Sequence, residues 1–306
     1  MKTEYKPSFR TKAVLILAAV PAALLAAACS SPAPTPTPVP PSATPAPSPT
    51  PAPTATAVQR ALTVTPTPST DSVIQYTTAY AYLSRGDFAE AERYFTTVIE
   101  LEPEFARGWD GRGQARLFKG DYEDALLDFD QAIALKPSLA QAYSHRAFAR
   151  MTTRDMAGAR RDAEKALSFN EDLIDAHIVL GRVYAAAGQN QEALNSFDRA
   201  VALAPKEGGV YWWRGRFYRD ALGDYQRALD DFDRAIEFDP AQASLFLDRA
   251  VLLLTVQAPL DLVKKDLEEA VSLAQEPKLP DILDQAEPLL ALVDEAIRTG
   301  KTLAPR

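Results

Sequence analysis

An internal repeat of 34 to 35 residues runs through the last two thirds of this 306-residue chain and limits the folds open to it. A small residue recurs once per unit, and an aromatic residue follows it four places later in most units. The two series are Ala91, Ala125, Ala159, Ala193 and Ala228, and Phe95, Phe129, Phe197 and Phe232, with Ala163 in the third unit. Periods of roughly 20 to 50 residues are typical of solenoids, whose units pack only on their neighbours.

Four further series keep the same spacing, so the periodicity is not a chance match. They are Val98, Ala132, Ala166, Ala200, Ala235 and Ala270; Pro103, Pro137, Pro205 and Pro240, with Glu171 in the third unit; Ala79, Gly113, Ala147, Gly181, Gly215 and Ala250; and Trp109, Tyr143, His177, Tyr211 and Phe246. The small residues are expected where helices approach closely, and the aromatic residues are expected to fill the gaps between neighbouring helices.

Each unit contains two apolar patterns of helical period, which predicts a pair of helices per unit. In the first two units, Arg85-Gly86-Asp87 and Lys119-Gly120-Asp121 separate the two patterns. Glycine is expected to end the first helix in a left-handed conformation, and the aspartate after it is expected to cap the second helix. Units five and six each carry one extra residue, near Asp220-Ala221 and Gln257-Ala258, which is expected to lengthen a loop.

This pattern resembles the tetratricopeptide repeat over residues 72–275. The resemblance implies an all-α, right-handed superhelical solenoid of antiparallel helix pairs, with about five to six repeats. The sixth repeat is degenerate. Residues 276–306 are expected to form a capping helix, within 281–298, and a C-terminal tail, because a solenoid must cover its last apolar face. Pro288 should kink this segment or start a new helix.

The first 28 residues have the pattern of a secretory signal peptide. Residues 2–12 are mostly polar with a basic excess, and residues 13–28 are wholly apolar. These 16 apolar residues fall short of the roughly 20 that a membrane-spanning helix needs.

The end of that segment, Ala26-Ala27-Ala28-Cys29, resembles the lipobox of bacterial lipoproteins, although Leu25 lies one place further upstream than the usual leucine. The resemblance implies that Cys29 is lipidated and holds the protein on the extracytoplasmic face of the bacterial cell membrane. A plain secretory signal cut after Ala28, or an uncleaved short anchor, are the alternatives.

Residues 29–71 contain the lipobox cysteine followed by a linker rich in proline, threonine and alanine. Of the 24 prolines in the chain, 13 fall between Pro32 and Pro68, and Arg60 is the one charged residue between Ser30 and Thr70. Such a segment cannot bury enough apolar surface to fold, and its prolines favour an extended conformation. At roughly 3.1 Å per residue, about 40 residues would reach some 120 Å from the membrane. A stalk is therefore predicted, with a ligand for proline-recognition domains as the alternative.

The charge of the chain argues against nucleic acid as a partner. The formal net charge is −8, and the first 29 residues carry four basic residues and one acidic residue. After Arg60 is also counted, residues 71–306 carry −12. A domain this acidic is not expected to bind nucleic acid or an anionic membrane surface.

The sequence contains no motif for catalysis, for a cofactor or for a metal, and we expect that the protein is not an enzyme. Its one cysteine and two histidines exclude most zinc and triad chemistry. His177 is expected to pack, because tryptophan and tyrosine take its place in other units, and His145 is expected at the surface or in a hydrogen bond between helices. The acidic clusters Asp128/Asp130 and Asp230/Asp231/Asp233 are expected on a solvated outer face, since no calcium-binding loop accompanies them.

The family resemblance implies a protein or peptide ligand in a concave groove formed by the first helices. The Lys and Asn pair by which some members hold a C-terminal carboxylate is replaced here by tyrosines. The positions that the resemblance assigns to the groove are Tyr76, Tyr80, Asp110, Gln114, Ser144, Phe148, Ile178, Arg182, Trp212, Arg216, Leu247 and Val251.

The C-terminal half of this groove is predicted to prefer an acidic partner. Trp212, Arg216 and Arg219 lie at i, i+4 and i+7 and share one helical stripe. Arg182 is expected to point toward the same groove, and guanidinium groups bind carboxylates in bidentate fashion. In the alternative interpretation, these arginines pair with acids of the domain itself, namely Asp175, Asp220 or Asp248.

Together these features predict a lipid-anchored scaffold for protein–protein interaction. Two alternatives are a structural assembly or envelope-biogenesis factor and an accessory binding subunit of an enzyme complex.

Overall fold

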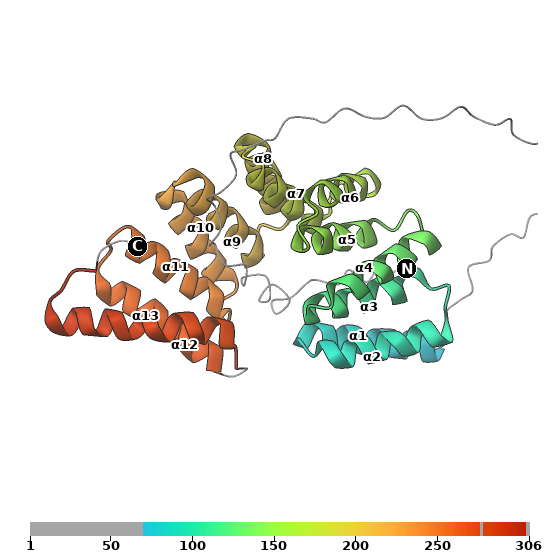
Figure 1. The fold of residues 1–306 in the computed structure, drawn as a ribbon, viewed down its shortest axis with the longest axis horizontal. Coiled ribbons are helices and arrows are strands. Elements are labelled where there is room, and N and C mark those ends of the chain that lie inside the picture. The colour runs from blue at the N-terminus through green and yellow to red at the C-terminus, as the bar shows by residue number, and fades with distance from the viewer. Residues whose placement is uncertain (1–69, 276–277, 304–306) are drawn as a thin grey trace, which may run out of the picture. The chain divides into compact units, whose positions relative to one another are not determined.

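The computed structural model describes residues 70–275 and 278–303, which form helices and connecting turns without any strand (Figure 1). Short turns fold each helix back on the one before it, and consecutive helices pack side by side. The predicted all-α fold of stacked helix pairs is confirmed. The helices are α1 (Thr70–Arg85), α2 (Phe88–Leu101), α3 (Ala106–Lys119), α4 (Tyr122–Leu135), α5 (Ala140–Thr152), α6 (Met156–Phe169), α7 (Ile174–Ala186), α8 (Asn190–Leu203), α9 (Gly208–Phe217), η2 (Tyr218–Leu222), α10 (Tyr225–Phe238), α11 (Ala243–Thr255), α12 (Leu260–Gln275) and α13 (Pro280–Thr299).

The predicted interlock between small and aromatic residues holds several of the helix pairs together. Phe129 on α4 is fully buried against Gly113 on α3, where an added Cβ atom would lie 2.6 Å from the phenylalanine ring. Gly181 and Phe197 repeat this contact between α7 and α8. Since no real Cβ comes so close to another atom, the ring occupies the space that glycine leaves open, and the two helices can approach.

The turn inside each unit places one residue in the left-handed region, as predicted for the first two units. Glycine suits this position because it lacks the Cβ atom that crowds the backbone there. In the third and sixth units a side-chain-bearing residue has to adopt the same conformation. The six residues are Gly86, Gly120, Arg154, Gly188, Gly223 and Gln257.

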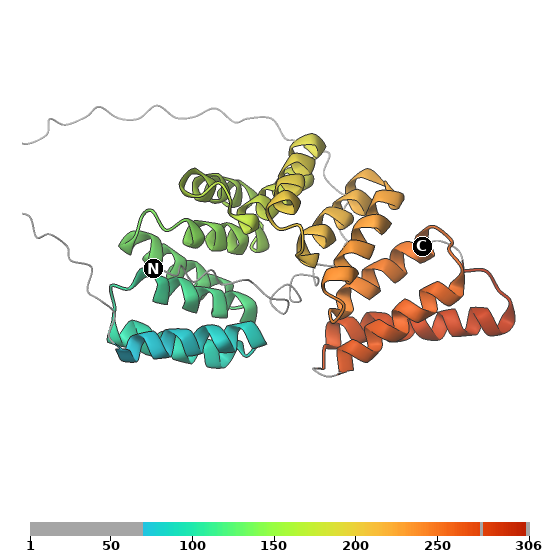
Figure 2. The ribbon, with the colours of Figure 1, turned by 180° about the vertical axis from the view of Figure 1, so that it is seen from behind.

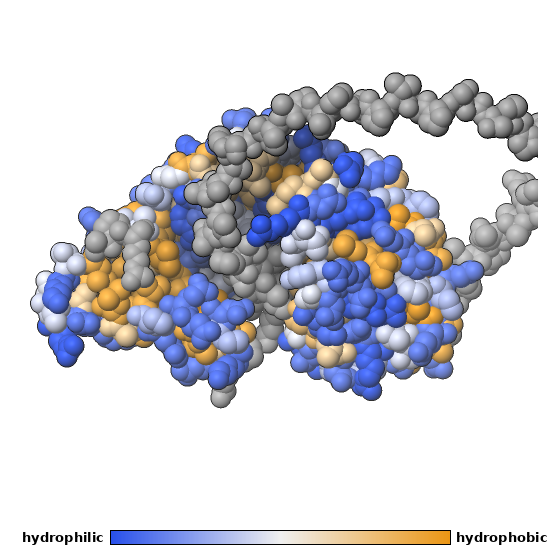
Figure 3. Space-filling view, viewed as in Figure 1, coloured by the Kyte–Doolittle hydropathy of each residue, from blue (hydrophilic) through white to orange (hydrophobic). Residues whose placement is uncertain are grey.

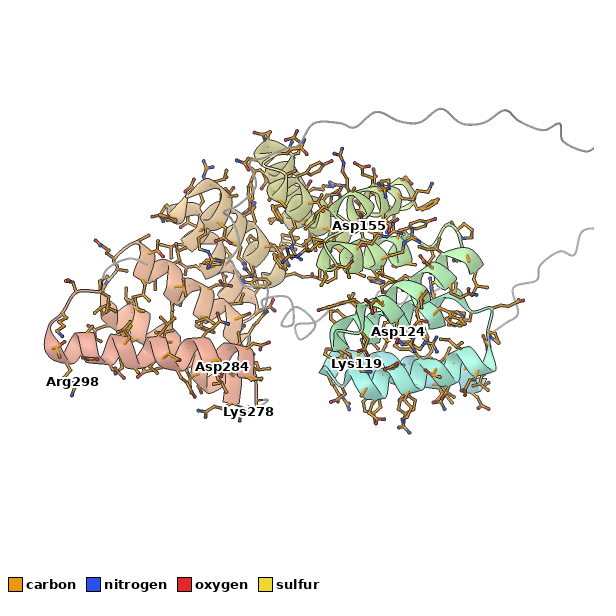
Figure 4. All side chains as sticks on the ribbon, in the orientation of Figure 1. Lys119, Asp124, Asp155, Lys278, Asp284 and Arg298 are labelled. Carbon is orange, nitrogen blue, oxygen red and sulfur yellow. The ribbon has the colours of Figure 1, made fainter. Side chains whose placement is uncertain are left out.

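The predicted aspartate caps occupy the expected positions, but their hydrogen bonds differ between units. Asp87 and Asp121 stand immediately before α2 and α4 without a side-chain bond to the helix backbone. Asp121 instead pairs at 2.9 Å with Lys119, the residue at the end of α3 that Figure 4 labels. In the third and fifth units, Asp155 and Asp224 do accept a hydrogen bond from the backbone N–H three residues on. The predicted N-cap positions of the first two units are therefore confirmed, although the aspartate side chains do not bond to the helix backbone there.

The extra residue of the fifth unit does not lengthen a loop, and that prediction was wrong. It is taken up inside the first helix, where η2 continues α9 as a π-helical turn that ends at the left-handed Gly223. A single inserted residue commonly produces such a turn. The sixth unit behaves as predicted, since residues 256–259 separate α11 from α12 and form a longer connection than the two residues between α3 and α4.

Helix α13 packs on α12 and α11 and covers the last apolar side of the stack (Figures 1 and 2). Ile282, Leu283 and Val293 are buried in this contact. Pro288 lies inside a single 20-residue helix, with Pro280 in its first turn. Figure 3 shows apolar residues gathered around α11 and α13 on the face in view.

The described helices include none that is both long and apolar enough to cross a lipid bilayer. The predicted signal peptide, Cys29 and the proline-rich linker lie outside the described residues.

Candidate functional site

The first helices of successive units follow one another along the stack. Contacts join α1 to α3, α3 to α5, α5 to α7 and α7 to α9. A hydrogen bond of 2.6 Å from Trp212 Nε1 to Asp248 Oδ2 joins α9 to α11. We call the surface formed by the predicted groove positions on these helices the first-helix face.

The positions of the first-helix face differ in exposure. Asp110, Gln114, Ser144, Trp212 and Leu247 are buried, and Val251 is exposed. The remaining predicted positions are half-buried: Tyr76, Tyr80, Phe148, Ile178, Arg182, Arg216 and Arg219.

At the N-terminal end of the face, polar side chains of three helices form one network. Gln114 Nε2 donates to Asp110 Oδ2 at 3.3 Å and to the Tyr80 hydroxyl at 3.5 Å. Asp110 Oδ1 lies 2.8 Å from His145 Nδ1. Burial raises the pKa of Tyr80, so its hydroxyl stays neutral. The rings of Tyr76 and Tyr80 meet edge to face at 4.9 Å.

His145 therefore lies in a buried hydrogen bond between α3 and α5. Burial lowers the pKa of its imidazole, but the charge of Asp110 and the hydrogen bond to it outweigh burial, and the pKa is raised overall. His177 has a different role. Its Nε2 lies 2.9 Å from the backbone oxygen of Glu171, and Trp109 makes the equivalent contact with Pro103 at 2.8 Å. The packing role predicted for His177 is thus accompanied by a hydrogen bond to the loop between units.

At the C-terminal end of the face, arginines lie over tryptophan rings. The guanidinium of Arg182 lies 4.1 Å from the centre of the Trp213 ring and 5.7 Å from that of Phe148. The guanidinium of Arg216 lies 5.2 Å from the Trp212 ring and 5.7 Å from the Trp213 ring. Burial lowers the pKa of Arg182, and the positive charge of Arg216 lowers it further.

Arg182 and the three residues of the predicted stripe, Trp212, Arg216 and Arg219, have different surroundings. Arg219 pairs with Asp220 at 2.6 Å and with Asp248 at 2.7 Å, as in the alternative interpretation of the sequence. Arg216 reaches Asp220 only at 4.0 Å. Trp212 is fully buried, as its bond to Asp248 requires. The ring under Arg182 belongs to Trp213, which the sequence analysis did not select.

The signal for Trp213 was present in the repeat. One unit earlier, its place is taken by Val179, and two units earlier by His145, which also contacts a neighbouring first helix. The position one place beyond Trp212 thus faces along the stack.

The seam between the two helices of a unit holds ion pairs that the sequence analysis missed. Asp128 and Asp231, predicted on a solvated outer face, are 2% and 5% exposed, and that prediction was wrong for both. Each carboxylate receives two hydrogen bonds from an arginine on the first helix of its own unit. The four seam pairs are Arg112–Asp128, Arg146–Asp162, Arg214–Asp231 and Arg249–Asp266.

The seam pairs follow the repeat, so the sequence could have shown them. In the fourth unit, Leu180 and Ser196 occupy the arginine and the aspartate positions. The arginine and the aspartate are thus replaced together in this unit, as expected for two residues that contact each other. Within the described residues no three His, Cys, Asp or Glu side chains come together in a way that could hold a metal ion.

A family model described as Tetratricopeptide repeat matches residues 76–140, 111–171 and 178–243, which together make up more than half of the chain. A search of curated proteins gives no match.

Solved structures with similar folds share little sequence with this chain. A tetratricopeptide repeat protein from Parabacteroides merdae is 19% identical, with a TM-score of 0.58, over 72% of this chain and 84% of that one. The APC/C hetero-tetramer Cut9–Hcn1 gives 20% identity and a TM-score of 0.61 over 71% of this chain and 42% of the matched one. A thermophilic repeat protein from Thermus thermophilus is 19% identical, with a TM-score of 0.55, over 61% of this chain and 99% of that one. This chain thus spans less than half of the chain it matches in Cut9–Hcn1. At these identities the likeness shows the fold alone.

Proposed function

We propose that this chain, which belongs to the tetratricopeptide repeat family, is a membrane-anchored scaffold that binds a protein or peptide partner along its first-helix face. Stacked helix pairs of this family serve protein–protein interaction. The finer assignment, to this face and to an anchored protein, is our own. We assign the protein a binding role and no catalytic one.

The observation that carries the assignment is a set of buried polar atoms without partners. In the part of the chain that the structure describes, four buried side-chain atoms have no hydrogen-bond partner, and three of them belong to the first-helix face. These three are Gln114 Oε1, Ser144 Oγ and Arg182 Nη1, on α3, α5 and α7. Leaving such an atom unpaired costs about 1–3 kcal/mol, and more for a charged group.

A bound peptide would supply the missing partners. The Gln114 oxygen accepts a hydrogen bond, the Ser144 hydroxyl donates or accepts one, and the Arg182 guanidinium donates. An extended chain offers backbone N–H and C=O groups at regular intervals. Since the three atoms are themselves buried, a segment laid along the three successive helices would reach them by displacing the half-buried side chains beside them. Binding would then recover free energy that the fold gives up in the absence of a partner.

The anchoring part of the proposal rests on the N-terminal sequence. The one cysteine of the chain, Cys29, directly follows three alanines at the end of an apolar segment. Several acyl chains on one residue anchor a protein firmly, whereas a single chain binds only marginally. We place the domain on the extracytoplasmic side of a bacterial membrane, at the end of the proline-rich linker.

One experiment tests the binding face with the full chain. The protein is cross-linked in intact cells, and the partner recovered with it is identified and quantified. Val251→Arg, on the exposed part of the first-helix face, should reduce recovery at least tenfold. Glu123→Arg, which adds the same group on an exposed part of α4, should leave recovery unchanged. Loss in both variants, or in neither, contradicts the assignment to this face.

A second experiment tests the anchor. Cys29→Ser should remove incorporation of an alkyne-labelled fatty acid and release the protein from the membrane fraction. If the variant is processed and stays membrane-bound like the parent, lipidation is not the anchor.

A further inference from the structure

Arg182 is an exception among the arginines of the described solenoid. Each of the other buried or half-buried arginines there has a carboxylate within 4.0 Å. Arg182 has none, and its Nη1 atom is buried without a hydrogen-bond partner. An uncompensated buried charge costs several kcal/mol, so the fold retains this arginine at an energetic loss.

The surroundings of Arg182 offset only part of this loss. The face of the Trp213 ring attracts the guanidinium, an interaction worth about 0.5–2 kcal/mol. Arg216, at the equivalent position of the next unit, acts in the opposite direction, because its positive charge repels that of Arg182. Its own nearest carboxylate, on Asp220, lies at the limit of an ion pair, at 4.0 Å. Both guanidinium groups therefore have donor capacity left over.

We propose that Arg182 and Arg216 together hold the side-chain carboxylate of an acidic segment in a protein partner. The proposal rests on the proposed function and names the ligand class of the same face. A carboxylate placed between the two groups would receive charge-assisted hydrogen bonds, which are about twice as strong as neutral ones. It would also cancel the repulsion between the arginines.

The site opens to solvent on the side of Arg216. The side chain of Arg216 is 24% exposed. Arg182 is half-buried, and its Nη1 atom is not accessible to solvent. Trp213 and Phe148 form an apolar wall beside the cations. An aromatic or aliphatic side chain next to the acid would pack against this wall, so an acidic segment with aromatic neighbours fits best.

The position of the site favours a side-chain carboxylate over the carboxylate of a chain terminus. It lies on α7 and α9, and the first helices α5 and α11 continue the face on either side. A ligand can therefore extend in both directions, which suits an internal segment.

The test measures fluorescence anisotropy of a labelled peptide, Ser-Tyr-Glu-Glu-Tyr-Glu-Ser, acetylated and amidated at its ends, with the full chain at low salt. A second peptide has glutamine at the three glutamate positions. We expect the glutamate peptide to bind at least tenfold more tightly, about 1.4 kcal/mol. Arg182→Leu should weaken its binding at least tenfold, and Arg216→Leu should weaken it in the same direction.

Arg161→Leu is the matched control. Arg161 is an exposed arginine on α6, so its replacement removes the same charge from another surface and should change the affinity less than about twofold. Equal binding of the two peptides, equal loss in Arg161→Leu, or no loss in an Arg182→Leu variant with native circular dichroism would each overturn the proposal. Displacement by inorganic phosphate as effective as by glutarate would overturn its preference for carboxylate.

The failure of this inference can be told apart from failure of the proposed function. If Val251→Arg abolishes recovery of the cellular partner while Arg182→Leu does not, the face binds a partner but the arginines do not recognise it. If neither variant affects recovery, the proposed function itself is wrong.

Discussion

Arginines at the seam and on the first-helix face of this solenoid have opposite environments. At the seam between α9 and α10, Arg214 makes two hydrogen bonds to the buried Asp231 and a third to the exposed Asp198. On the face, Arg182 has no carboxylate. The seam is enclosed by the unit itself, so the counter-charge has to come from the same chain. The face is open, so a partner can supply one.

The pKa shifts of the two arginines reflect this difference. Burial lowers the pKa of Arg214, but the hydrogen bonds and charge of Asp231 outweigh burial and raise it overall. For Arg182, burial lowers the pKa and Arg216 adds to the effect. Where the sequence omits the seam arginine, as at Leu180, it omits the aspartate too, at Ser196. The repeat therefore avoids an unpaired charge at the seam and tolerates one on the face.

The largest effect on stability is expected when a seam arginine loses its buried carboxylate, so that it comes to resemble Arg182 on the first-helix face. Asp231→Ala leaves Arg214 buried with only the exposed Asp198 as partner. We expect the free energy of unfolding to fall by about 3 kcal/mol, measured by urea denaturation followed by circular dichroism. Asp230→Ala, at an exposed neighbouring position, should change it by less than about 0.5 kcal/mol. Equal effects of the two variants would mean that burial of the pair does not matter.

Removing both seam charges should be far less harmful than removing one. The double variant Arg214→Leu, Asp231→Ser copies the pair found in the fourth unit. It leaves no buried charge unpaired, so its unfolding free energy should lie within about 1.5 kcal/mol of the parent protein. A double variant as unstable as Asp231→Ala would show that the seam arginine contributes mainly by packing.

Arg182→Leu should have the opposite effect on stability from that of a seam substitution. Because the fold gains no ion pair from Arg182 and bears the cost of burying its charge, we expect the free energy of unfolding to stay equal or rise by about 1 kcal/mol. Thermal and urea denaturation of the full chain without a partner measure this. A loss of 2 kcal/mol or more would mean that Arg182 serves the fold.

The paired charge at the other end of the face should depend on pH. Because the pKa of His145 is raised in the folded state, its contribution to stability is complete below the unfolded value of about 6.5 and is lost as pH rises through the folded value. His145→Gln should therefore lower the free energy of unfolding by about 1 kcal/mol more at pH 5.5 than at pH 9. His177→Gln, at a position whose histidine pKa is lowered, mainly by burial, should not show this excess at low pH.

The smallest effect concerns backbone strain, away from both regions. Arg154 adopts φ +68° where four other units have glycine. Arg154→Gly should raise the free energy of unfolding by about 0.5–1 kcal/mol, because glycine enters this conformation without steric cost. The reverse substitution in the second unit, Gly120→Arg, should lower it by a similar amount. Urea denaturation of both variants checks that the free energy of unfolding rises in the first and falls in the second.

The regular part of the fold could be predicted because each contact recurs. Phe129 against Gly113 is repeated by Phe197 against Gly181, so the six series marked both the helix pairs and their close approach. The π-helical η2 was not predictable in this way. An extra residue near Asp220 is compatible with a longer loop or with a bulge inside the helix, and packing around the turn decides between them.

The candidate site was predicted at the level of helix faces and not of individual contacts. The repeat alignment selected Gln114, Ser144 and Arg182, whose buried atoms lack partners, but it gave no sign of that property. It selected Trp212 and passed over Trp213. Neighbouring positions on a helix differ by about 100° in direction, and packing decides which of the two buried rings meets Arg182.

Periodicity and local chemistry were sufficient to identify the fold family and the pair of helices in each unit. Which charges are neutralised was decided only when helices distant in sequence came together. The sequence around Asp128 does not distinguish it from an exposed acidic residue. It becomes a buried partner of Arg112 because α3 packs on α4. Arg182 remains unpaired because α5 and α9 bring aromatic rings and a second arginine to it instead of a carboxylate. The energy of a charge depends on its neighbours within a few ångströms, and those neighbours come from the tertiary structure.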